Sequence, residues 1–286
     1  MNAAAGMLFA QATGEGRWRF PVSLDDVDPQ FVSMLVAYED KRFFGHNGID
    51  PLAIMRAAWQ FATHGRIVSG GSTITMQLAR LMEPRAERSV TAKLRQMARA
   101  VQIERRLSKR EILERYLVLA PYGGNLEGIR AASLAWFGKE PLKLRLSEAA
   151  LLVALPQSPE SRRPDRAPRQ ARAARDRVLW RMAGAGLIAQ TEIARASGFD
   201  VPQDREAMPA LSAHLSMAVL AKTDQRDAPH RLTLDATYQR ALESVAREGA
   251  ARLPAGVSVA MVLLDAATGE MLARVGSADH LDESRS

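Results

Sequence analysis

Apolar residues recur at intervals of three and four along residues 25–155, which is the spacing of one face of an α-helix. One such set consists of Leu94, Met97, Ala98 and Val101. Pairs of glycines interrupt the pattern at residues 70–71 and 123–124, where turns are expected. The spacing therefore predicts a mainly α fold, in which the Leu94 set forms one face of a helix.

Local signals mark where several helices begin and end. Ser108 is a favourable N-cap, and Glu111 three residues later completes a capping box. Ser147 opens a further apolar helix, which Pro156 ends. An alanine- and arginine-rich segment predicts another helix from about residue 170 to residue 183.

The C-terminal part of the sequence changes character. Residues 186–231 indicate a short helix followed by a linker. A helix is indicated next by Tyr238, Leu242, Val245 and Gly249. Residues 257–265 and 271–275 then predict two β-strands joined by a turn. Because two strands make too little sheet to be stable alone, the tail is interpreted as the truncated start of a second domain.

Charge and composition limit the partners and the chemistry. Lys and Arg number 39 against 32 Asp and Glu, which gives a net charge of +7 and favours an anionic partner. The absence of cysteine excludes disulfides, thiolate metal sites and a cysteine nucleophile. No apolar run approaches the ~18–20 residues of a membrane span, and residues 1–14 lack the basic start of a signal peptide. A soluble or membrane-peripheral chain is therefore expected.

Two segments combine residue types that carry chemistry. Residues 39–48 join an acidic pair, two basic residues, two phenylalanines and a histidine. Residues 69–77 join two glycines to hydroxyl and amide side chains, and such a segment can present N–H and hydroxyl groups to anionic oxygens. The lysine that ends a P-loop is missing, so nucleotide binding is not supported. Either segment alone also fits a solvated helix end or a loop before a capped helix, so their combination carries the argument.

Taken in order, these segments resemble the glycosyltransferase domain of class A penicillin-binding proteins. The first motif of that family, Glu-Asp-x-x-Phe-x-x-His-x-Gly, matches residues 39–48 at every fixed position. The second, Gly-x-Ser-x-x-Thr-x-Gln, matches residues 70–77. Residues 108–117 and 131–139 resemble two further motifs of the family. Residues 123–128 and 155–159 look closest to the penicillin-binding protein 1C branch.

The resemblance implies a lysozyme-like helical domain that polymerises lipid II into β-1,4 glycan strands by inverting displacement of a lipid pyrophosphate. Glu39 holds the position of the base that takes a proton from the attacking sugar hydroxyl, a role that typically contributes ~10²–10⁴-fold. The substrate-binding positions implied are Asp40, His46, Gly71, Ser72, Thr75, Gln77, Arg80, Arg88 and Lys93. The arginines suit a pyrophosphate because one guanidinium binds two oxygens.

One position departs from the family pattern. The second catalytic glutamate of the family is Gln96 here, whose amide neither accepts a proton at neutral pH nor binds a cation strongly. Helix geometry places Gln96 on one face with Lys93 and Ala100, opposite the Leu94 set, so Gln96 is expected to line the cleft. Because pyrophosphate can leave without a general acid, only a partial loss of activity is expected.

The resemblance also implies partners and a location. Lipid II, the growing glycan chain, the membrane surface and other cell-wall synthesis proteins are implied as partners, and nucleic acid is not. No metal held by the protein is implied, although Mg²⁺ or another divalent cation could accompany the pyrophosphate. The implied location is the outer face of the bacterial cytoplasmic membrane, in the periplasm, with no anchor or signal peptide in this chain.

Three segments follow from the resemblance: the glycosyltransferase domain over residues 1–185, a linker over 186–231, and the truncated start of a transpeptidase domain over 232–286. The acyl-serine motifs Ser-x-x-Lys, Ser-x-Asn and Lys-Thr-Gly are absent, so no transpeptidase activity is expected from this chain. Two alternatives are a non-catalytic module that holds lipid II or glycan, and a hydrolase of lysozyme-like architecture. Nucleic-acid binding would rest on charge alone.

Overall fold

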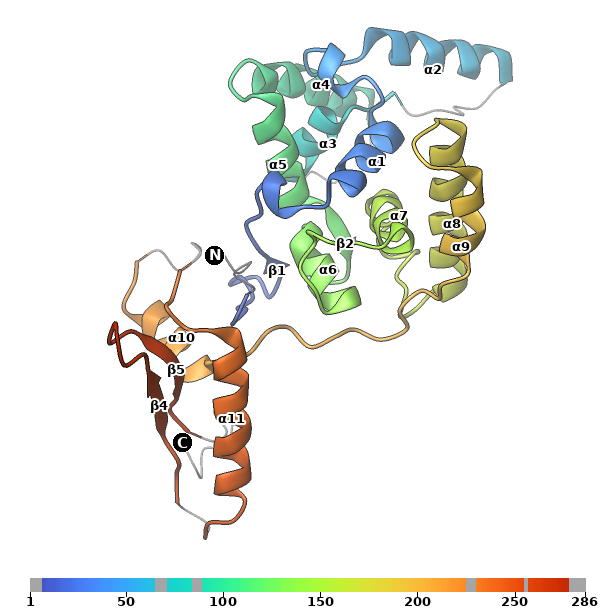
Figure 1. The fold of residues 1–286 in the computed structure, drawn as a ribbon. Helices are drawn as coiled ribbons and strands as arrows, with labels where there is room; N and C mark the ends of the chain where they lie inside the picture. Colours follow the sequence, from blue (N-terminus) through green and yellow to red (C-terminus); the bar gives the residue numbers. More distant parts are fainter. Residues whose placement is uncertain (1–6, 65–70, 84–88, 225–229, 255–256, 278–286) are drawn as a thin grey trace. The chain divides into compact units, whose positions relative to one another are not determined.

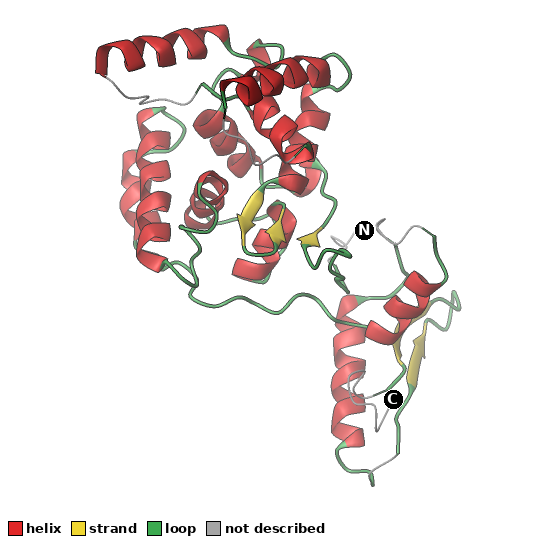
Figure 2. Ribbon diagram, turned by 180° about the vertical axis from the view of Figure 1, so that it is seen from behind, coloured by secondary structure: helices red, strands yellow, loops and turns green. Residues whose placement is uncertain are grey.

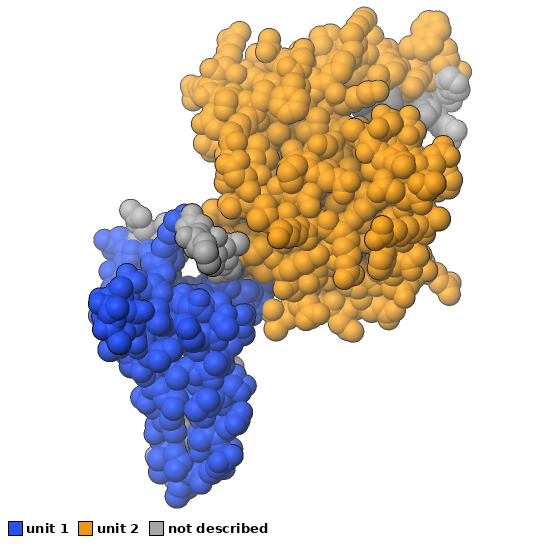
Figure 3. Space-filling view, viewed as in Figure 1, with its two compact units in different colours: residues 1–13, 208–286 blue, residues 14–207 orange. Residues whose placement is uncertain are grey.

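A computed structural model describes residues 7–64, 71–83, 89–224, 230–254 and 257–277. The chain divides into two compact units (Figure 3). The larger unit comprises Gly14–Ala207, and the smaller comprises Met1–Thr13 together with Met208–Ser286. Helices predominate in both, as the sequence predicted (Figure 2). No helix among the described residues has the length and apolar character needed to cross a membrane.

The larger unit is a set of helices joined by short loops (Figure 1). Its α-helices are α1 (Pro29–Glu39), α2 (Pro51–His64), α3 (Ile74–Met82), α4 (Val90–Glu104), α5 (Lys109–Leu119), α6 (Ile129–Phe137), α7 (Leu146–Ala154), α8 (Pro168–Gly184) and α9 (Gln190–Ser197). Short 3-10 turns lie at η1 (Leu24–Asp26), η2 (Phe43–Gly45) and η3 (Leu155–Gln157). The predicted capping box of Ser108 and Glu111 is present at the start of α5.

Helix α7 forms the centre of this unit. It packs against α1, α6 and α8, and all its residues from Ala149 to Ala154 are buried. Its alanines allow neighbouring helices to approach closely, while Leu151 and Leu152 fill the space between them. This packing fixes α1 and α8, the two elements that later supply the base and several arginines.

A small sheet closes one side of the larger unit. Strand β3 (Leu126–Glu127) lies between β1 (Trp18–Arg19), to which it is parallel, and β2 (Pro121–Gly123), to which it is antiparallel. Arg19 binds the largely buried carboxylate of Glu127 at 2.7 Å, which ties β1 to β3. The sheet was not predicted because two- and three-residue strands have no measurable periodicity.

Helix α4 turns its Leu94 side away from the core. Its buried residues are Ala92, Ala100 and Ile103, whereas Leu94 is 59% exposed. The helix therefore turns its small residues toward α3 and leaves the Leu94 side outside. The periodicity was real, but it identified the outer face, because apolar spacing alone does not say which surface a face meets.

The smaller unit contains α10 (Ala213–Ala221), α11 (Ala236–Ala250) and a hairpin of β4 (Met261–Leu264) and β5 (Met271–Val275). Helix α11 packs on the hairpin, and the buried Gln239 exchanges two 2.8 Å hydrogen bonds with the backbone of Arg274. The hairpin and α11 agree with the prediction. Helix α10 was not predicted, because its apolar residues lie all around the helix and give no periodic signal.

The compact units divide the chain at other points than the predicted segments. Helix α9 is the short helix predicted at the start of residues 186–231, and it packs against α8 in the larger unit, which extends to Ala207. Residues before Gly14 belong to the smaller unit, where Phe9 pairs with Ala210.

Candidate functional site

Glu39 is the last residue of α1. Asp28 caps the start of this helix by accepting a 2.8 Å hydrogen bond from the Gln30 N–H, and Pro29 occupies the first turn. Phe31, Met34 and Leu35 anchor the helix in the core. The chain leaves the helix at Asp40, so the acidic pair lies at a point fixed by packing.

Gln77 holds one oxygen of the Glu39 carboxyl group, and Tyr116 in turn holds Gln77. Gln77 Nε2 donates to Glu39 Oε2 at 2.9 Å, and Tyr116 Oη donates to Gln77 Oε1 at 3.3 Å. The amide of Gln77 is thereby oriented with its N–H groups toward Glu39. Burial raises the pKa of Glu39, although the Gln77 hydrogen bond and the charges of Arg181 and Arg162 oppose this effect. A carboxyl group with a raised pKa is suited to accept a proton near neutral pH.

Asp40 joins the first motif to the second. Its carboxylate lies 2.9 Å from His46 Nε2 and accepts a 3.0 Å hydrogen bond from the Ile74 N–H at the start of α3. A carboxylate is favoured there by the exposed N–H groups of a helix N-terminus. Burial raises the pKa of Asp40, against the effects of the Ile74 N–H and His46. Asp40 and His46 are both buried.

Gly48 permits a close contact that the first motif requires. Its φ of +92° is left-handed, and a Cβ there would lie 2.7 Å from the backbone of Ala100 in α4. Thr73, the N-cap of α3, donates to the Gly48 carbonyl at 2.6 Å. The final glycine of the motif therefore lets α4 and α3 close on the loop after Glu39.

A buried ionic network joins α3, α4 and the start of α5 to the loop that contains His46. Glu104 Oε1 accepts from Thr75 Oγ1 and from Lys109 Nζ, each at 2.7 Å. Lys109 also donates to the His46 carbonyl at 2.7 Å and lies 4.4 Å from the ring centroid of Phe43. The Thr75 side chain, predicted to bind substrate, is fully buried in this network. It joins α3 to α4 rather than facing solvent.

The predicted basic positions come together in part. Lys93 donates to Ser72 Oγ, and burial followed by the charge of Arg80 lowers the pKa of Lys93. Ser72, Arg80 and Lys93 therefore form one group of donors, next to Gly71. Arg88, which was predicted for the same site, lies outside the described residues. Gln96 is half-buried on the inner side of α4, on the same face as Ala92 and Ala100.

A second basic group near Glu39 left no signal in the sequence. Arg162 donates to the Ala154 carbonyl at 2.7 Å and to Gln157 at 2.9 Å, and Arg181 lies 4.7 Å from the ring centroid of Tyr38. Burial and the neighbouring charge of Arg177 lower the pKa of Arg162. A hollow of about 250 Å³ is lined by Ser158, Ser161, Arg162, Gln170, Ala173 and Arg177. Only the fold brings these arginines to Glu39, across more than a hundred residues of sequence.

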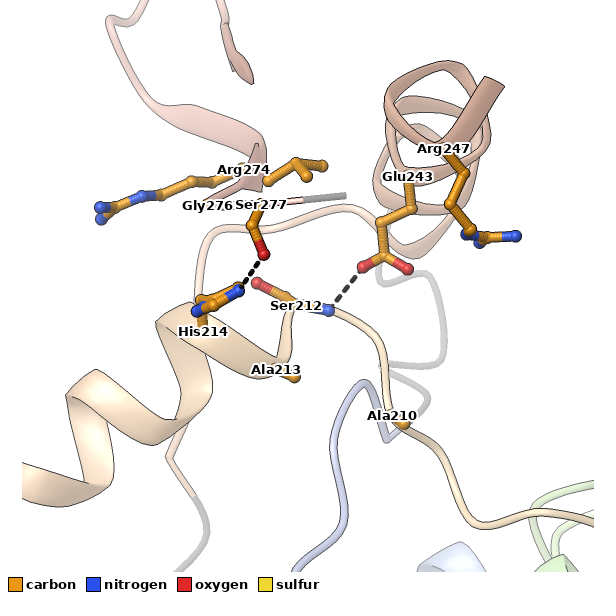
Figure 4. Close-up of a pocket in the computed structure, with 10 residues that line it drawn as sticks. Ala210, Ser212, Ala213, His214, Glu243, Arg247, Arg274, Gly276 and Ser277 are labelled. Carbon is orange, nitrogen blue, oxygen red and sulfur yellow. Dashed lines mark hydrogen bonds between the residues drawn. The ribbon is translucent and has the colours of Figure 1, made fainter. Parts of the chain in front are cut away.

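A further hollow belongs to the smaller unit (Figure 4). It measures about 270 Å³ and includes His214, whose Nε2 lies 2.7 Å from Ser277 Oγ. Glu243 accepts from the Ser212 N–H at 2.7 Å. None of the residues that the motifs singled out lines this hollow.

The donor set does not fit a metal held by the protein. Within the described ranges, no three His, Asp or Glu side chains gather closely enough to bind an ion. Asp40 is occupied by His46 and the Ile74 N–H, and Gln96 offers only an amide. No step of the reaction is therefore assigned to such an ion.

Comparison with known proteins identifies the family of the chain. The Transglycosylase family model matches residues 5–183. Penicillin-binding protein 1C of Escherichia coli (strain K12) is 44% identical over 278 residues, which cover 97% of this chain and 36% of that protein. Penicillin-binding protein 1A of the same organism is 41% identical over 189 residues, covering 66% of this chain and 22% of that protein.

The chain thus spans about a third of the length of the first of these relatives. A crystal structure of penicillin-binding protein 1A from Haemophilus influenzae aligns with a TM-score of 0.40 at 18% identity, over 85% of this chain and 30% of that one. The family match extends over more than half of the residues and includes both motifs. The chain therefore belongs to the transglycosylase family.

Proposed function

We propose that this chain is a peptidoglycan glycosyltransferase that polymerises lipid II into β-1,4 glycan strands. The observation that carries the proposal is Glu39, a largely buried carboxyl group of raised pKa with basic groups nearby. Helices α3 and α4 lie on one side of α1 and α8 lies on the other, so these basic groups come from both sides of the base (Figure 1).

Glu39 acts as the general base. It takes the proton of the acceptor hydroxyl as that oxygen attacks the anomeric carbon of the donor, and the bond from this carbon to the pyrophosphate oxygen breaks. The attack comes from the face opposite the leaving group, so the α-linked donor gives a β-linked product. The raised pKa of Glu39 makes it a stronger base once ionised.

The leaving pyrophosphate is stabilised by Ser72, Arg80 and Lys93. The lowered pKa of Lys93 reflects burial and the nearby charge of Arg80, and an anion between the two groups removes that repulsion. Hydrogen-bond donors that are fixed before the reaction stabilise developing charge effectively. Gln96, on the inner face of α4, can donate a hydrogen bond to the substrate but no proton.

The hollow beside α8 holds an anionic group of the second substrate molecule. Arg162 and Arg177 lie close enough to repel each other. Arg162 is held by Ala154 and Gln157, so its guanidinium is oriented before a ligand arrives. Arg162→Ala is expected to raise the KM for lipid II more than it lowers kcat.

An exposed apolar surface supports contact with the membrane that carries lipid II. Leu52, Met55 and Trp59 share one face of α2, and Trp59 is 71% exposed. Val90 and Leu94 share the outer face of α4. An exposed patch of this kind on a folded domain marks an interaction surface, and tryptophan is favoured at the level of lipid head groups.

We further infer a lysozyme-like fold for the larger unit and the beginning of a transpeptidase domain in the smaller one. The similarity to penicillin-binding protein 1C continues through 97% of the chain, well beyond residue 183, which supports the second assignment. The corresponding location is the outer face of the cytoplasmic membrane. Other cell-wall synthesis proteins are proposed partners on the same basis.

A lipid II polymerisation assay tests the function. The 286-residue chain is expected to convert fluorescent lipid II into glycan strands, and Glu39→Gln is expected to bind lipid II without forming them. Asp26→Asn, which changes an exposed carboxylate on η1, is the matched control and should retain activity. Polymer formed by Glu39→Gln would contradict the assignment of the base.

The same assay separates the alternatives. Binding of lipid II without turnover by the unaltered chain would favour a non-catalytic module, and cleavage of finished peptidoglycan would favour a hydrolase. Addition of magnesium or a chelator shows whether the pyrophosphate must carry a cation.

A further inference from the structure

The hollow in the smaller unit contains a buried hydroxyl group that has no hydrogen-bond partner among the described residues. Ser212 is 4% exposed, it lines the hollow, and its Oγ makes no hydrogen bond. Figure 4 shows this oxygen on the side of Ser212 that faces His214 and Ser277. Buried polar groups in folded proteins nearly always have a partner, so this exception indicates a hydrogen-bonding group that the hollow receives from outside.

The local backbone does not explain why a serine occupies this position. Ser212 has a φ of +56°, and within the described ranges it is the one residue other than glycine with a left-handed backbone. Glycine would adopt this conformation without strain, and alanine would avoid burying an unpaired hydroxyl group. Ser212 is the N-cap of α10, yet its side chain makes no capping hydrogen bond. Strained residues of this kind cluster at ligand sites, so the hydroxyl group is held for a contact outside the helix.

The N-terminus of α10 also faces the hollow. Ser212, Ala213 and His214 line it, and the first N–H groups of a helix have no partner within that helix. These groups give the helix N-terminus a partial positive charge, which favours an anion. The unpaired hydroxyl group and the helix N-terminus therefore favour the same kind of ligand, a hydrogen-bond acceptor with negative charge.

Positive charge exceeds negative charge among the described residues that line the hollow. Arg247 from α11 and Arg274 from β5 lie on opposite sides of it (Figure 4). Glu243 is the opposing charge, and its Oε1 already accepts from the Ser212 N–H at 2.7 Å and from Gln239 Nε2 at 2.9 Å. Two guanidinium groups against one carboxylate leave one positive charge, with histidine counted as neutral. A carboxylate ligand balances this charge, whereas Glu243 would repel a doubly charged phosphate more strongly.

The size and the walls of the hollow define the rest of the ligand. Its volume of about 270 Å³ equals that of roughly nine water molecules, so a ligand of about ten non-hydrogen atoms fits. Ala210, Ala213 and Val275 supply apolar wall, and the 2.7 Å hydrogen bond between His214 Nε2 and Ser277 Oγ fixes a polar side. Apolar walls with a few fixed polar groups are typical of sites for small molecules.

We propose that this hollow binds a small organic carboxylate of about dipeptide size. Ser212 Oγ donates a hydrogen bond to the carboxylate, and the N-terminus of α10 stabilises its charge. Arg247 and Arg274 attract the anion from either side. The site contains no residue of the proposed glycosyltransferase site, so the inference does not depend on the role of Glu39.

Isothermal titration calorimetry of the 286-residue chain with N-acetyl-alanyl-alanine tests the proposal. Saturable binding is expected, and the C-terminal amide of the same dipeptide, which lacks the charge, is expected not to bind. Ser212→Ala keeps the strained backbone and removes only the hydroxyl group. It should weaken binding about tenfold or more, because a hydrogen bond to a charged group is lost. Ser244→Ala changes an exposed serine of α11 outside the lining and should leave the affinity unchanged.

A second substitution at the same position separates loss of binding from loss of folding. Ser212→Gly should lose as much affinity as Ser212→Ala but unfold at a higher temperature, because glycine relieves the left-handed strain. Glu39→Gln should bind the dipeptide as the unaltered chain does, whatever its effect on polymerisation. The proposal is overturned by absence of saturable binding, by equal binding of the amide, or by unchanged affinity in Ser212→Ala. Inorganic phosphate that bound as tightly as the dipeptide would also overturn it, since the hollow would then recognise charge alone.

Discussion

Substitution of Glu104 by glutamine removes its charge with little change in side-chain shape. The structure indicates how much free energy of unfolding this change costs. Glu104→Gln keeps an oxygen for the Thr75 hydroxyl but leaves the Lys109 ammonium without its counter-charge. The Glu104 side chain is 6% exposed and that of Lys109 is 22% exposed. Breaking a fully buried pair costs about 3–5 kcal/mol, and a hydrogen bond to a charged group is worth about 1.5–3 kcal/mol.

Because Lys109 retains some contact with water and its bond to the His46 carbonyl, the lower half of this combined range applies. Glu104→Gln should therefore lower the free energy of unfolding by about 2–3 kcal/mol. Urea denaturation measures this as a fall in the midpoint at constant slope. Adding Lys109→Met in the same chain should recover part of the loss, because the uncompensated charge disappears.

The outcome also decides between two roles for this glutamate. A structural role predicts that stability falls and that polymerisation falls only as far as the loop holding His46 is disturbed. If Glu104→Gln abolished polymerisation while its urea midpoint stayed unchanged, the structural role would be refuted. Glu104 would then take the role of the family's second catalytic glutamate, whose position is occupied by Gln96 in this chain.

Three more variants test the base, the glycine contact and the basic group. Folding raises the pKa of Glu39, so the protonated carboxyl group stabilises the folded state. This stabilisation is present below the ordinary pKa and declines as pH rises through the pKa of the folded state. The decline is about 1.4 kcal/mol for each pH unit that separates the two pKa values. Glu39→Gln should hence raise the thermal midpoint at pH 7 but not at pH 4. Gly48→Ala should cost about 1–3 kcal/mol in urea denaturation, because its left-handed backbone packs on Ala100. Lys93→Ala should slow polymerisation about 100-fold, whereas the exposed Arg95→Ala should not.

Sequence alone predicted the features that depend on neighbouring residues. Helix starts such as Ser108 with Glu111 are local, because a cap satisfies N–H groups of its own first turn. The hairpin at the C-terminal end was predictable for a similar reason, since alternation and a turn are contained within one short segment. The motifs at residues 39–48 and 70–77 also resemble those of the family to which the comparison assigns the chain.

The fold decided which of these residues contact one another and which groups surround each of them. Gln77 was predicted as a substrate contact, yet its amide reaches Glu39, and Thr75 two residues earlier turns inward to Glu104. Residues two apart on a helix lie on different faces, so two neighbouring positions of one sequence motif can contact different parts of the structure.

Arg162 and Arg181 have no mark in the sequence, because their significance is their charge near Glu39. The pKa of Glu39 is likewise a property of packing, since burial is its principal cause. The sequence therefore determined which chemistry the chain carries. Tertiary structure decided how the base is held, because desolvation and hydrogen-bond direction exist only after distant segments have packed together.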